Sequence, residues 1–443
     1  MEYTITVEPP NPYREYLAHA DGKLRFIQRF PKYEFANPIL VYSQRMNLQS
    51  LKKPEILLML MAASVPLSFS VWMTLLDNFA IERVAFTGRE IGILQSLREI
   101  PGFMAFAVVF VLLLVKEQKL AFLSLILLGV GTMLTGWFPT VLGLYATTVL
   151  MSLGFHYYET MQTSLSLQWL DKKQAPHVLG KIIAVGSFAS LIIYGTLALA
   201  TSVWSVDYKV IYMVGGGLTV AIAVFCWWFF PHYPEKVVQH KTIILRRRYW
   251  LYYALVFMSG ARRQIFVVFA GFMMVQKFGY SVGQISTLFL VNASLNMFLA
   301  PRIGRLIGRV GERRALTLEY IGLICIFSAY AFVTDHRFAA GLYILDHMFF
   351  AMAIAIKTYF QKIADPRDIA STAAVGFTIN HIAAVVLPAI LGLVWVVSPS
   401  AVFLVGAGMA LISLLLSRLV PRHPEEGQEV VRLSAGPVRD GVG

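Results

Sequence analysis

Runs of about 20 mostly apolar residues, the length that a helix needs to cross the hydrocarbon core of a bilayer, recur along this 443-residue chain. Apolar residues make up 57% of the sequence and charged residues only 14%. This composition excludes an ordinary water-soluble domain. We therefore predict an all-α membrane protein with twelve transmembrane helices. The expected segments are 54–78, 90–115, 119–137, 140–167, 178–201, 208–231, 249–276, 281–302, 315–334, 338–360, 369–396 and 398–419.

The lysines and arginines between these segments are distributed unevenly. When the connections are assigned alternately to the two sides of the membrane, thirty of the 38 Lys and Arg residues fall on the side of the N-terminus and five on the other. Basic residues are retained on the cytoplasmic side of a membrane. Both termini are therefore predicted to be cytoplasmic. The net charge of +13 is explained by this topology, and no nucleic-acid partner is expected.

The longest connection divides the segments into six plus six, and the two halves resemble each other weakly. Residues 90–122 align without gaps on 284–316, which places Arg98 opposite Asn292. Internal repeats of this kind are common in secondary transporters. The predicted domains are a cytoplasmic N-terminal extension (1–53), a six-helix bundle (54–231), a cytoplasmic linker (232–248), a second six-helix bundle (249–420) and a cytoplasmic tail (421–443).

The connection after the eighth segment reads "GRLIGRVGERRAL", from Gly304 to Leu316. It resembles the loop signature of the major facilitator superfamily, although Gly308 stands where that family usually has Asp. The resemblance implies two bundles around a central cavity that is lined by segments 1, 4, 7 and 10. It also implies a gating loop, in which the glycines allow a tight turn and the arginines stay at the cytoplasmic surface. The matching residues are Gly304, Arg309, Gly311, Arg313 and Arg314.

Two adjacent arginines, Arg262 and Arg263, lie in the middle of the seventh segment, in "SGARRQIF". Charged groups at this depth are costly and usually face a cavity or a partner. One interpretation is that a guanidinium binds the anionic group of a substrate. The alternative is an internal salt bridge to Glu159 or Asp346. Further candidate substrate-binding residues are Arg98, Asn292, Asn380, His381 and Tyr157.

Several ionisable side chains in the fourth and tenth segments are candidates for proton coupling. A carboxyl group within the membrane can carry a proton, and His156 and Glu159 share one helix face. The alternative is that these groups form static ion pairs. The candidates are His156, Glu159, Asp346, His347 and Lys357.

The sequence favours a secondary transporter that moves a small, anionic solute by alternating access, with possible coupling to protons. A soft-metal transporter of the same fold is one alternative, because thioethers and imidazole suit Cu(I), and its ligands would be His347, Met348 and Met352. A membrane assembly factor that does not transport is another.

An enzyme is not expected, because the chain has no nucleophile and base pattern and no phosphate-binding loop. No cofactor is expected either. The expected partners are the solute and the lipid bilayer, with the protein a monomer in the bacterial inner membrane.

Overall fold

The computed structural model describes residues 16–18, 24–26, 52–170, 175–204, 206–234, 245–365 and 369–431. The chain divides into two compact units, residues 1–51 and 52–443, and each is considered by itself. In the first unit, β1 (Tyr16–Ala18) pairs antiparallel with β2 (Leu24–Phe26) in a short hairpin. This hairpin falls within the predicted N-terminal extension (1–53), and the helices are found from residue 54 onwards.

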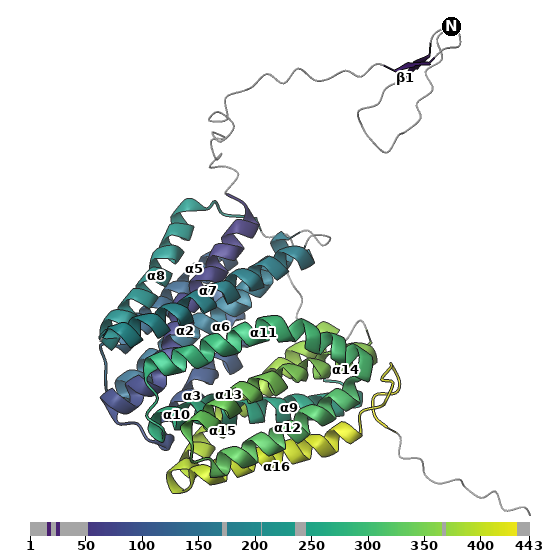
Figure 1. Ribbon diagram of the computed structural model, residues 1–443. Helices are drawn as coiled ribbons and strands as arrows, with labels where there is room; N and C mark the ends of the chain where they lie inside the picture. The colour runs from purple at the N-terminus through teal and green to yellow at the C-terminus, as the bar shows by residue number, and fades with distance from the viewer. Residues whose placement is uncertain are drawn as a thin grey trace, which may run out of the picture. The chain divides into compact units, whose positions relative to one another are not determined.

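The first half of the second unit forms one group of helices, coloured purple to teal in Figure 1. A 3₁₀ turn, Met104–Ala107, connects its two shortest members, α3 and α4. The helices are α2 (Pro54–Val84), α3 (Gly88–Phe103), α4 (Val108–Leu112), α5 (Glu117–Thr135), α6 (Val141–Trp169), α7 (Ala175–Val203) and α8 (Tyr208–Phe229).

The second half forms the green to yellow group in Figure 1. A 3₁₀ turn precedes α9, a π-helical segment, Ile265–Ala270, joins α9 to α10, and another 3₁₀ turn, Ala351–Ala353, joins α13 to α14. The helices are α9 (Trp250–Gln264), α10 (Gly271–Gln276), α11 (Val282–Val310), α12 (Glu312–Phe332), α13 (His336–Phe350), α14 (Ile354–Ile363), α15 (Ile369–Val397) and α16 (Pro399–Arg418).

Ten helices of the described residues are long and apolar enough to cross a membrane. The two predicted segments outside this set are 90–115 and 140–167, which correspond to α3 with α4 and to α6. Both contain ionisable groups, among them Glu99 and His156, and α3 ends after only 16 residues, two positions beyond Pro101. The short length of α3 and the polar residues of both segments place them outside the set. The count of twelve spans stays a prediction.

The expected loop at residues 304–314 is shorter than predicted. Helix α11 continues through Gly304 and Gly308 to Val310, and α12 begins at Glu312. The turn is made at Gly311, whose φ of 84° is readily adopted only by glycine. Spaced four residues apart, Gly304 and Gly308 lie in one helix between good helix formers, so neither glycine breaks the helix.

The helices α3 and α11 begin in the same way, at positions that the predicted repeat aligns. Thr87 and Glu90 form a capping box at the start of α3, and Ser281 and Gln284 form one at the start of α11. In each box the Thr or Ser hydroxyl accepts from a backbone amide of the first turn, and the Glu or Gln side chain accepts from the backbone amide of the Thr or Ser. These bonds satisfy amide donors that have no partner within the helix. The shared cap supports the repeat that few sequence identities suggested.

The two groups of helices are in close contact through α3 and α15. A Cβ atom on Gly92 would be 2.2 Å from the carbonyl oxygen of Pro388, and one on Gly88 would be 2.0 Å from Trp395 Cδ1. The backbone amide of Ala389 also donates to the hydroxyl of Ser96 at 3.0 Å. These helices approach so closely that only glycine fits at the contact.

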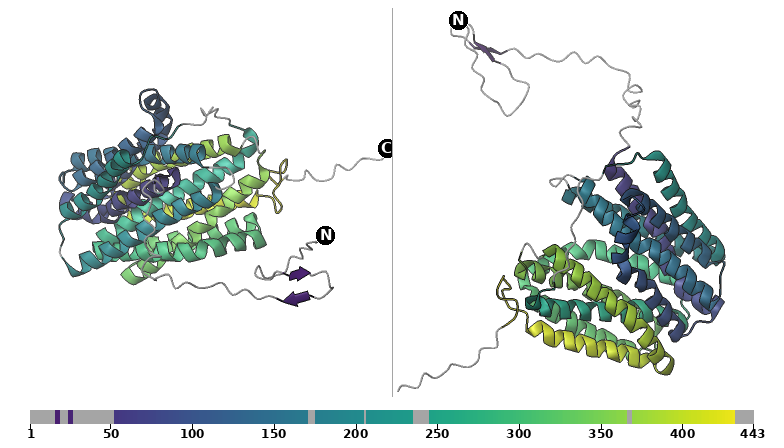
Figure 2. Two further views of the ribbon diagram at one scale, coloured as in Figure 1. Left: turned by 90° about the horizontal axis from the view of Figure 1, so that it is seen from above. Right: turned by 180° about the vertical axis from the view of Figure 1, so that it is seen from behind.

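A second contact joins α7 to α11. A Cβ atom on Gly283 would lie 2.7 Å from the Ser202 hydroxyl. Close by, the side-chain amide of Asn78 donates to the Tyr280 carbonyl at 2.7 Å. Together with the α3 and α15 contact, these interactions are at the end of the bundles where α2 and α7 end and α3 and α11 begin. Figure 2 shows the two groups from above and from behind.

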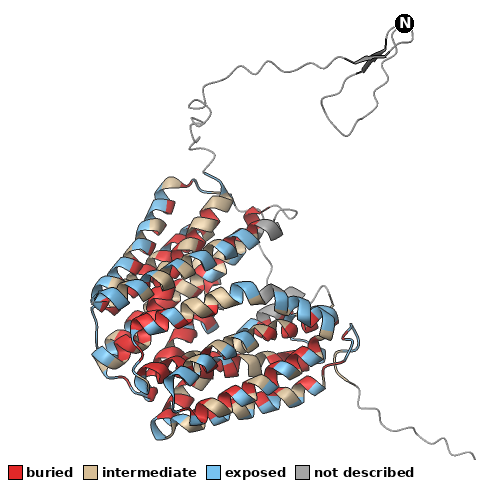
Figure 3. Ribbon diagram, in the orientation of Figure 1, coloured by how far each residue is buried: buried red, intermediate tan, exposed pale blue. Residues whose placement is uncertain are grey.

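Many large apolar residues are exposed, and Figure 3 shows in pale blue where exposed residues lie along the helices. Trp228 is 83% exposed, Leu142 78% and Val397 86%. Outside a membrane such side chains would form apolar patches far larger than soluble monomers carry. These residues therefore require a lipid environment.

The α3 and α15 contact predicts the effect of a single methyl group. Gly92→Ala would place Cβ against the Pro388 carbonyl and force the helices apart, so it should lower stability by roughly 1–3 kcal/mol. Gly195→Ala is the control, because a Cβ there meets nothing within 4 Å. Thermal unfolding of the purified protein in detergent measures both variants. Equal midpoints for Gly92→Ala and the unchanged protein would contradict the packing.

Candidate functional site

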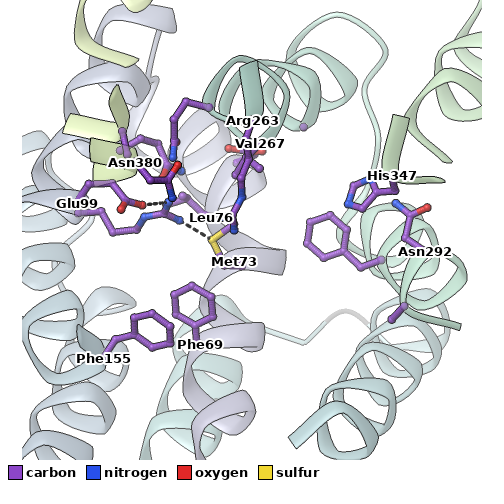
Figure 4. A pocket seen from close by; sticks show the side chains of 18 of the residues that line it. Phe69, Met73, Leu76, Glu99, Phe155, Arg263, Val267, Asn292, His347 and Asn380 are labelled. Carbon is purple, nitrogen blue, oxygen red and sulfur yellow. Dashed lines mark hydrogen bonds and ion pairs between the residues drawn. The ribbon is translucent and has the colours of Figure 1, made fainter. Parts of the chain in front are cut away.

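A cavity of about 490 Å³ lies between the two groups of helices, and residues of both groups line it. Side chains reach it from α2, α3, α6 and α7 on one side and from α9 to α11, α13 and α15 on the other. Its walls contain three carboxylates, two guanidinium groups and three imidazoles. Figure 4 shows Glu99, Arg263 and Asn380 near one another, with His347 and Asn292 across the cavity.

Arg98 and Glu99 of α3 are both buried and form an ion pair with each other. Arg98 Nη1 also contacts Met73 Sδ at 3.1 Å, and the Arg98 carbonyl accepts from the Ser152 hydroxyl. Arg98 therefore lines the cavity with its charge already neutralised by Glu99. Pairing of this kind lowers the cost of placing either charge among apolar helices.

A row of acidic and imidazole groups continues from Glu99 along the same wall. Glu99 Oε2 is 3.7 Å from His381 Nε2, and His156 Nδ1 is 3.6 Å from Glu159 Oε2. The rings of His156 and His381 meet edge to face, with centroids 5.4 Å apart. Glu159 is half exposed toward the cavity, whereas the two histidines are buried. Groups from α3, α6 and α15 thus form one polar cluster.

Arg262 and Arg263 point to different surroundings. Arg262 is buried, with Nη2 3.5 Å from Glu319 Oε1 of α12 and its guanidinium 4.6 Å from the Tyr320 ring centroid. Arg263 lines the cavity and is exposed there, 5.9 Å from the centroid of the Phe350 ring. Adjacent residues of a helix project about 100° apart, which explains the separation.

The structure assigns Arg262 a partner that the sequence did not indicate. The expected partners were Glu159 and Asp346, but the ion pair is made with Glu319, which is fully buried. Asp346 lies near enough to interact electrostatically with both Arg262 and Glu319. Among the ion pairs of the described residues, none includes Arg263.

Most of the other predicted polar residues line the cavity. Asn292, Asn380, His381, His347, His156, Glu159 and Arg98 do so. The Nδ1 atoms of His347 and His381 lie 3.1 and 3.0 Å from the carbonyls of Tyr343 and Phe377, one turn earlier in each helix. Those contacts leave Nε2 of each ring directed away from its own helix backbone.

Other predicted residues lie outside the cavity lining. Asp346 is buried beside Arg262, Tyr157 is half-buried on α6, and Lys357 is exposed on α14. The proposed soft-metal ligands are divided, because His347 lines the cavity whereas Met348 and Met352 do not. The arginines of the predicted gating loop lie at the end of α11 and the start of α12, and none of them lines the cavity.

Sequence reasoning missed Asp77 and the aromatic part of the wall. The predicted first segment stopped at residue 78, but α2 continues to Val84, so Asp77 is inside the helix and lines the cavity. Its position as the only acid between Glu55 and Glu82 was the available signal. Phe69 and Phe155 stack at 4.2 Å between ring centroids, and both line the cavity.

This arrangement can bind a polar solute that also has an apolar face. The guanidinium of Arg263 and the amides of Asn292 and Asn380 supply donors, while the Phe69 and Phe155 pair supplies a flat apolar surface. A cavity with few convergent polar groups and aromatic walls is typical of small-molecule sites.

Comparison with known proteins agrees with this arrangement. The sequence profile of the Major Facilitator Superfamily matches residues 57–388. The crystal structure of nucleoside transporter NupG superposes with a TM-score of 0.67 at 15% identity, covering 84% of this chain and 98% of that one.

A bacterial homolog of the human lysosomal transporter Spinster, in an inward-facing and unoccupied conformation, superposes with a TM-score of 0.66 at 12% identity. That match covers 84% of this chain and 98% of the other. A search of curated protein sequences found no match. With its apolar helices and two groups around a cavity, the chain belongs to the major facilitator superfamily of multi-pass membrane transporters.

Proposed function

We propose that the protein is a secondary transporter of a small organic anion, with Arg263 as the residue that binds the anionic group. The observation that carries this proposal is the contrast between the three arginines nearest the cavity. Arg98 is paired with Glu99 and Arg262 with Glu319, whereas Arg263 faces the cavity and belongs to no ion pair of the described residues. A carboxylate or phosphate of the solute would accept two parallel hydrogen bonds from this guanidinium.

The rest of the cavity limits the kind of anion. A volume of about 490 Å³ suits a solute of metabolite size. The stacked Phe69 and Phe155 rings favour a planar or apolar part, and the amides of Asn292 and Asn380 favour additional hydrogen-bonding groups. We therefore expect an amphipathic organic anion to bind more tightly than a small inorganic one.

The charges of the cavity support coupling to protons. Asp77, Glu99 and Glu159 oppose only Arg98 and Arg263, so the fully ionised carboxylates exceed the guanidinium groups by one. An incoming anion increases this negative excess in a medium of low polarity, where unbalanced charge is costly. Protonation of one carboxyl group together with anion binding returns the cavity to the net charge that it had before the anion entered. Glu159, exposed to the cavity beside His156, is the acid that we assign to this proton.

The bundle contacts suggest the state of the transport cycle. The close contacts at Gly88, Gly92 and Gly283 are all at one end of the bundles. With the cytoplasmic termini predicted from the Lys and Arg distribution, that end is the outer one. If the two bundles rock to give alternating access, this arrangement is the state that is closed to the outside, with the cavity accessible from the cytoplasm.

Replacing Arg263 tests the anion site. Arg263→Ala removes the charge-assisted hydrogen bonds and should weaken binding by about 10- to 100-fold, while the protein remains folded because none of the ion pairs among the described residues includes Arg263. Anionic compounds are first screened for stabilisation of the unchanged protein in detergent, and the best binder is then titrated into the variant. Lys357→Ala is the control, because that exposed cation lies outside the cavity. Unaltered affinity in Arg263→Ala would refute the assignment.

Arg262 should respond differently from its neighbour. Arg262→Ala leaves Glu319 buried without a partner, so it should destabilise the folded protein by about 3–5 kcal/mol. Adding Glu319→Gln to Arg262→Ala should recover part of that loss, because no uncompensated charge then remains. Thermal unfolding midpoints measure both effects. If Arg262→Ala keeps full stability but loses solute binding, the roles of the two arginines have been exchanged.

Proton coupling is tested in proteoliposomes with a confirmed solute. In the unchanged protein an imposed proton gradient should drive accumulation of the solute. Glu159→Gln should abolish that response but retain solute exchange without a gradient, because the amide keeps the shape of the acid and cannot cycle a proton. Accumulation that still follows the gradient in Glu159→Gln would exclude this residue as the proton carrier.

A further inference from the structure

The geometry points to a binding site for a divalent transition metal of the Zn²⁺ type, formed by Glu99, His156 and His381 across the interface of the two bundles. One ligand atom from each of these side chains lies within 4.8 Å of the other two. Glu99 is on α3 and His156 on α6 in the first bundle, while His381 is on α15 in the second. This inference is independent of the proposed anion transport.

The distances are close to those of a metal site. Zn²⁺ bonds to nitrogen and oxygen of about 2.0–2.2 Å place tetrahedral ligand atoms roughly 3.4 Å apart. Glu99 Oε2 and His381 Nε2 are 3.7 Å apart. Small side-chain rotations are therefore enough to bring the three ligand atoms to bonding distance.

Both imidazoles are oriented as metal ligands usually are. A ligating histidine donates its second N–H to a carbonyl or carboxylate, which fixes the ring and directs the other nitrogen toward the metal. Nδ1 of His381 is 3.0 Å from the Phe377 carbonyl, within hydrogen-bonding distance, whereas Nδ1 of His156 is 3.6 Å from Glu159 Oε2, an ion-pair distance that a small movement of the exposed Glu159 side chain shortens to a hydrogen bond. In each ring Nε2 remains for the metal.

Glu99 is held in a similar way. Its Oε1 accepts from the guanidinium of Arg98, whereas its Oε2 is directed toward His381. Arg98 therefore orients the carboxylate and leaves one oxygen free to coordinate. Together with Glu159, Glu99 also offsets the positive charges of Arg98 and Arg263 around an incoming cation.

Gly102 keeps the space between the rings open. A Cβ atom at this position of α3 would be 2.6 Å from His381 Nε2 and 2.8 Å from His156 Cε1. The absence of a side chain lets the two imidazole edges approach one another. All three ligand residues also line the cavity, so a fourth coordination position is open to water or to a bound anion.

Two nitrogens and one carboxylate oxygen suit borderline metals such as Zn²⁺ and Co²⁺ better than Mg²⁺ or Ca²⁺, which prefer oxygen ligands. A metal bound here links α3 and α6 to α15. Because rocking of the bundles changes the distance of α15 from α3 and α6, the metal stabilises the arrangement seen here and opposes transport.

Metal binding is tested with the purified, tag-free, full-length protein in detergent. Zn²⁺ is titrated by calorimetry, and Co²⁺ is followed by the visible absorption of its low-symmetry complexes. We expect one Zn²⁺ per chain and a Co²⁺ spectrum typical of four ligands. His381→Ala and Glu99→Gln should each weaken Zn²⁺ binding by at least about tenfold.

Two further variants separate the site from other effects. His336→Ala is the matched control, because that exposed imidazole lies beside Asp335 at the surface and not in the cavity. It should bind Zn²⁺ like the unchanged protein. Gly102→Ala retains every ligand but fills the space between the rings, so it too should lose affinity. Unfolding midpoints without metal establish that each variant is folded.

The outcomes are distinct. No binding of Zn²⁺ or Co²⁺, or equal affinity in the unchanged protein, His381→Ala and Glu99→Gln, overturns the metal site and leaves the anion transport proposal intact. Loss of affinity in these variants with His336→Ala unchanged supports it. Zn²⁺ should then also slow solute exchange in proteoliposomes, and His381→Ala should relieve that inhibition.

Discussion

The high cost of placing a charge among apolar helices determines how this molecule is organised. Each ionisable group that the structure describes in the middle of the bundles either has a partner or faces the cavity. Arg262 is bound to Glu319 beneath the Tyr320 ring, and Arg98 is bound to Glu99. Once these pairs are formed, the guanidinium of Arg263 is the group that we propose to bind the solute.

The same constraint explains why the contacts between the bundles rely on glycines. Charged or polar side chains at a helix interface would each need a partner, whereas Gly88 and Gly92 of α3 allow the backbone of α15 to pack directly against them. Because no charge has to be separated when such a contact opens, the bundles can move apart at low cost. Ionic groups lie around the cavity instead, where binding of a solute, a proton or a metal would change the net charge.

Much of the fold was predictable because the membrane restricts the choices. Apolar runs located most helix ends to within a few residues, although α2 and α11 continue six and eight residues beyond their predicted ends, and the capping boxes at Thr87 and Ser281 support the predicted repeat alignment. Positions that depend on three-dimensional contacts were not predictable. Glu319 lies close to its helix start in sequence, so its burial against Arg262 follows only from the packing of α12 on α9. Asp77 was missed because the end of α2 has no helix-breaking residue to mark it.

The candidate site illustrates a further limit of sequence reasoning. Arg263, Asn292 and Asn380 were expected to line a cavity from their depth in the segments, and the structure brings them to one. The cluster of Glu99, His156 and His381 was not visible, because His381 is more than 200 residues along the chain from the other two and the three belong to different helices. The depth of a residue in a membrane segment can be counted along the sequence. Which faces of separate helices point toward one another cannot be read from it.

The position of this cluster has a consequence for the transport cycle. Glu99 and His156 belong to one bundle and His381 to the other, so their mutual distances change whenever the bundles rock. A ligand affects such an equilibrium only through a difference in affinity between the two states. Any cation that requires all three side chains, whether a metal or a shared proton, therefore binds one state preferentially. Arg263, the proposed anion-binding residue, is also on the second bundle, so under the proposed function solute and cation would act on the same movement.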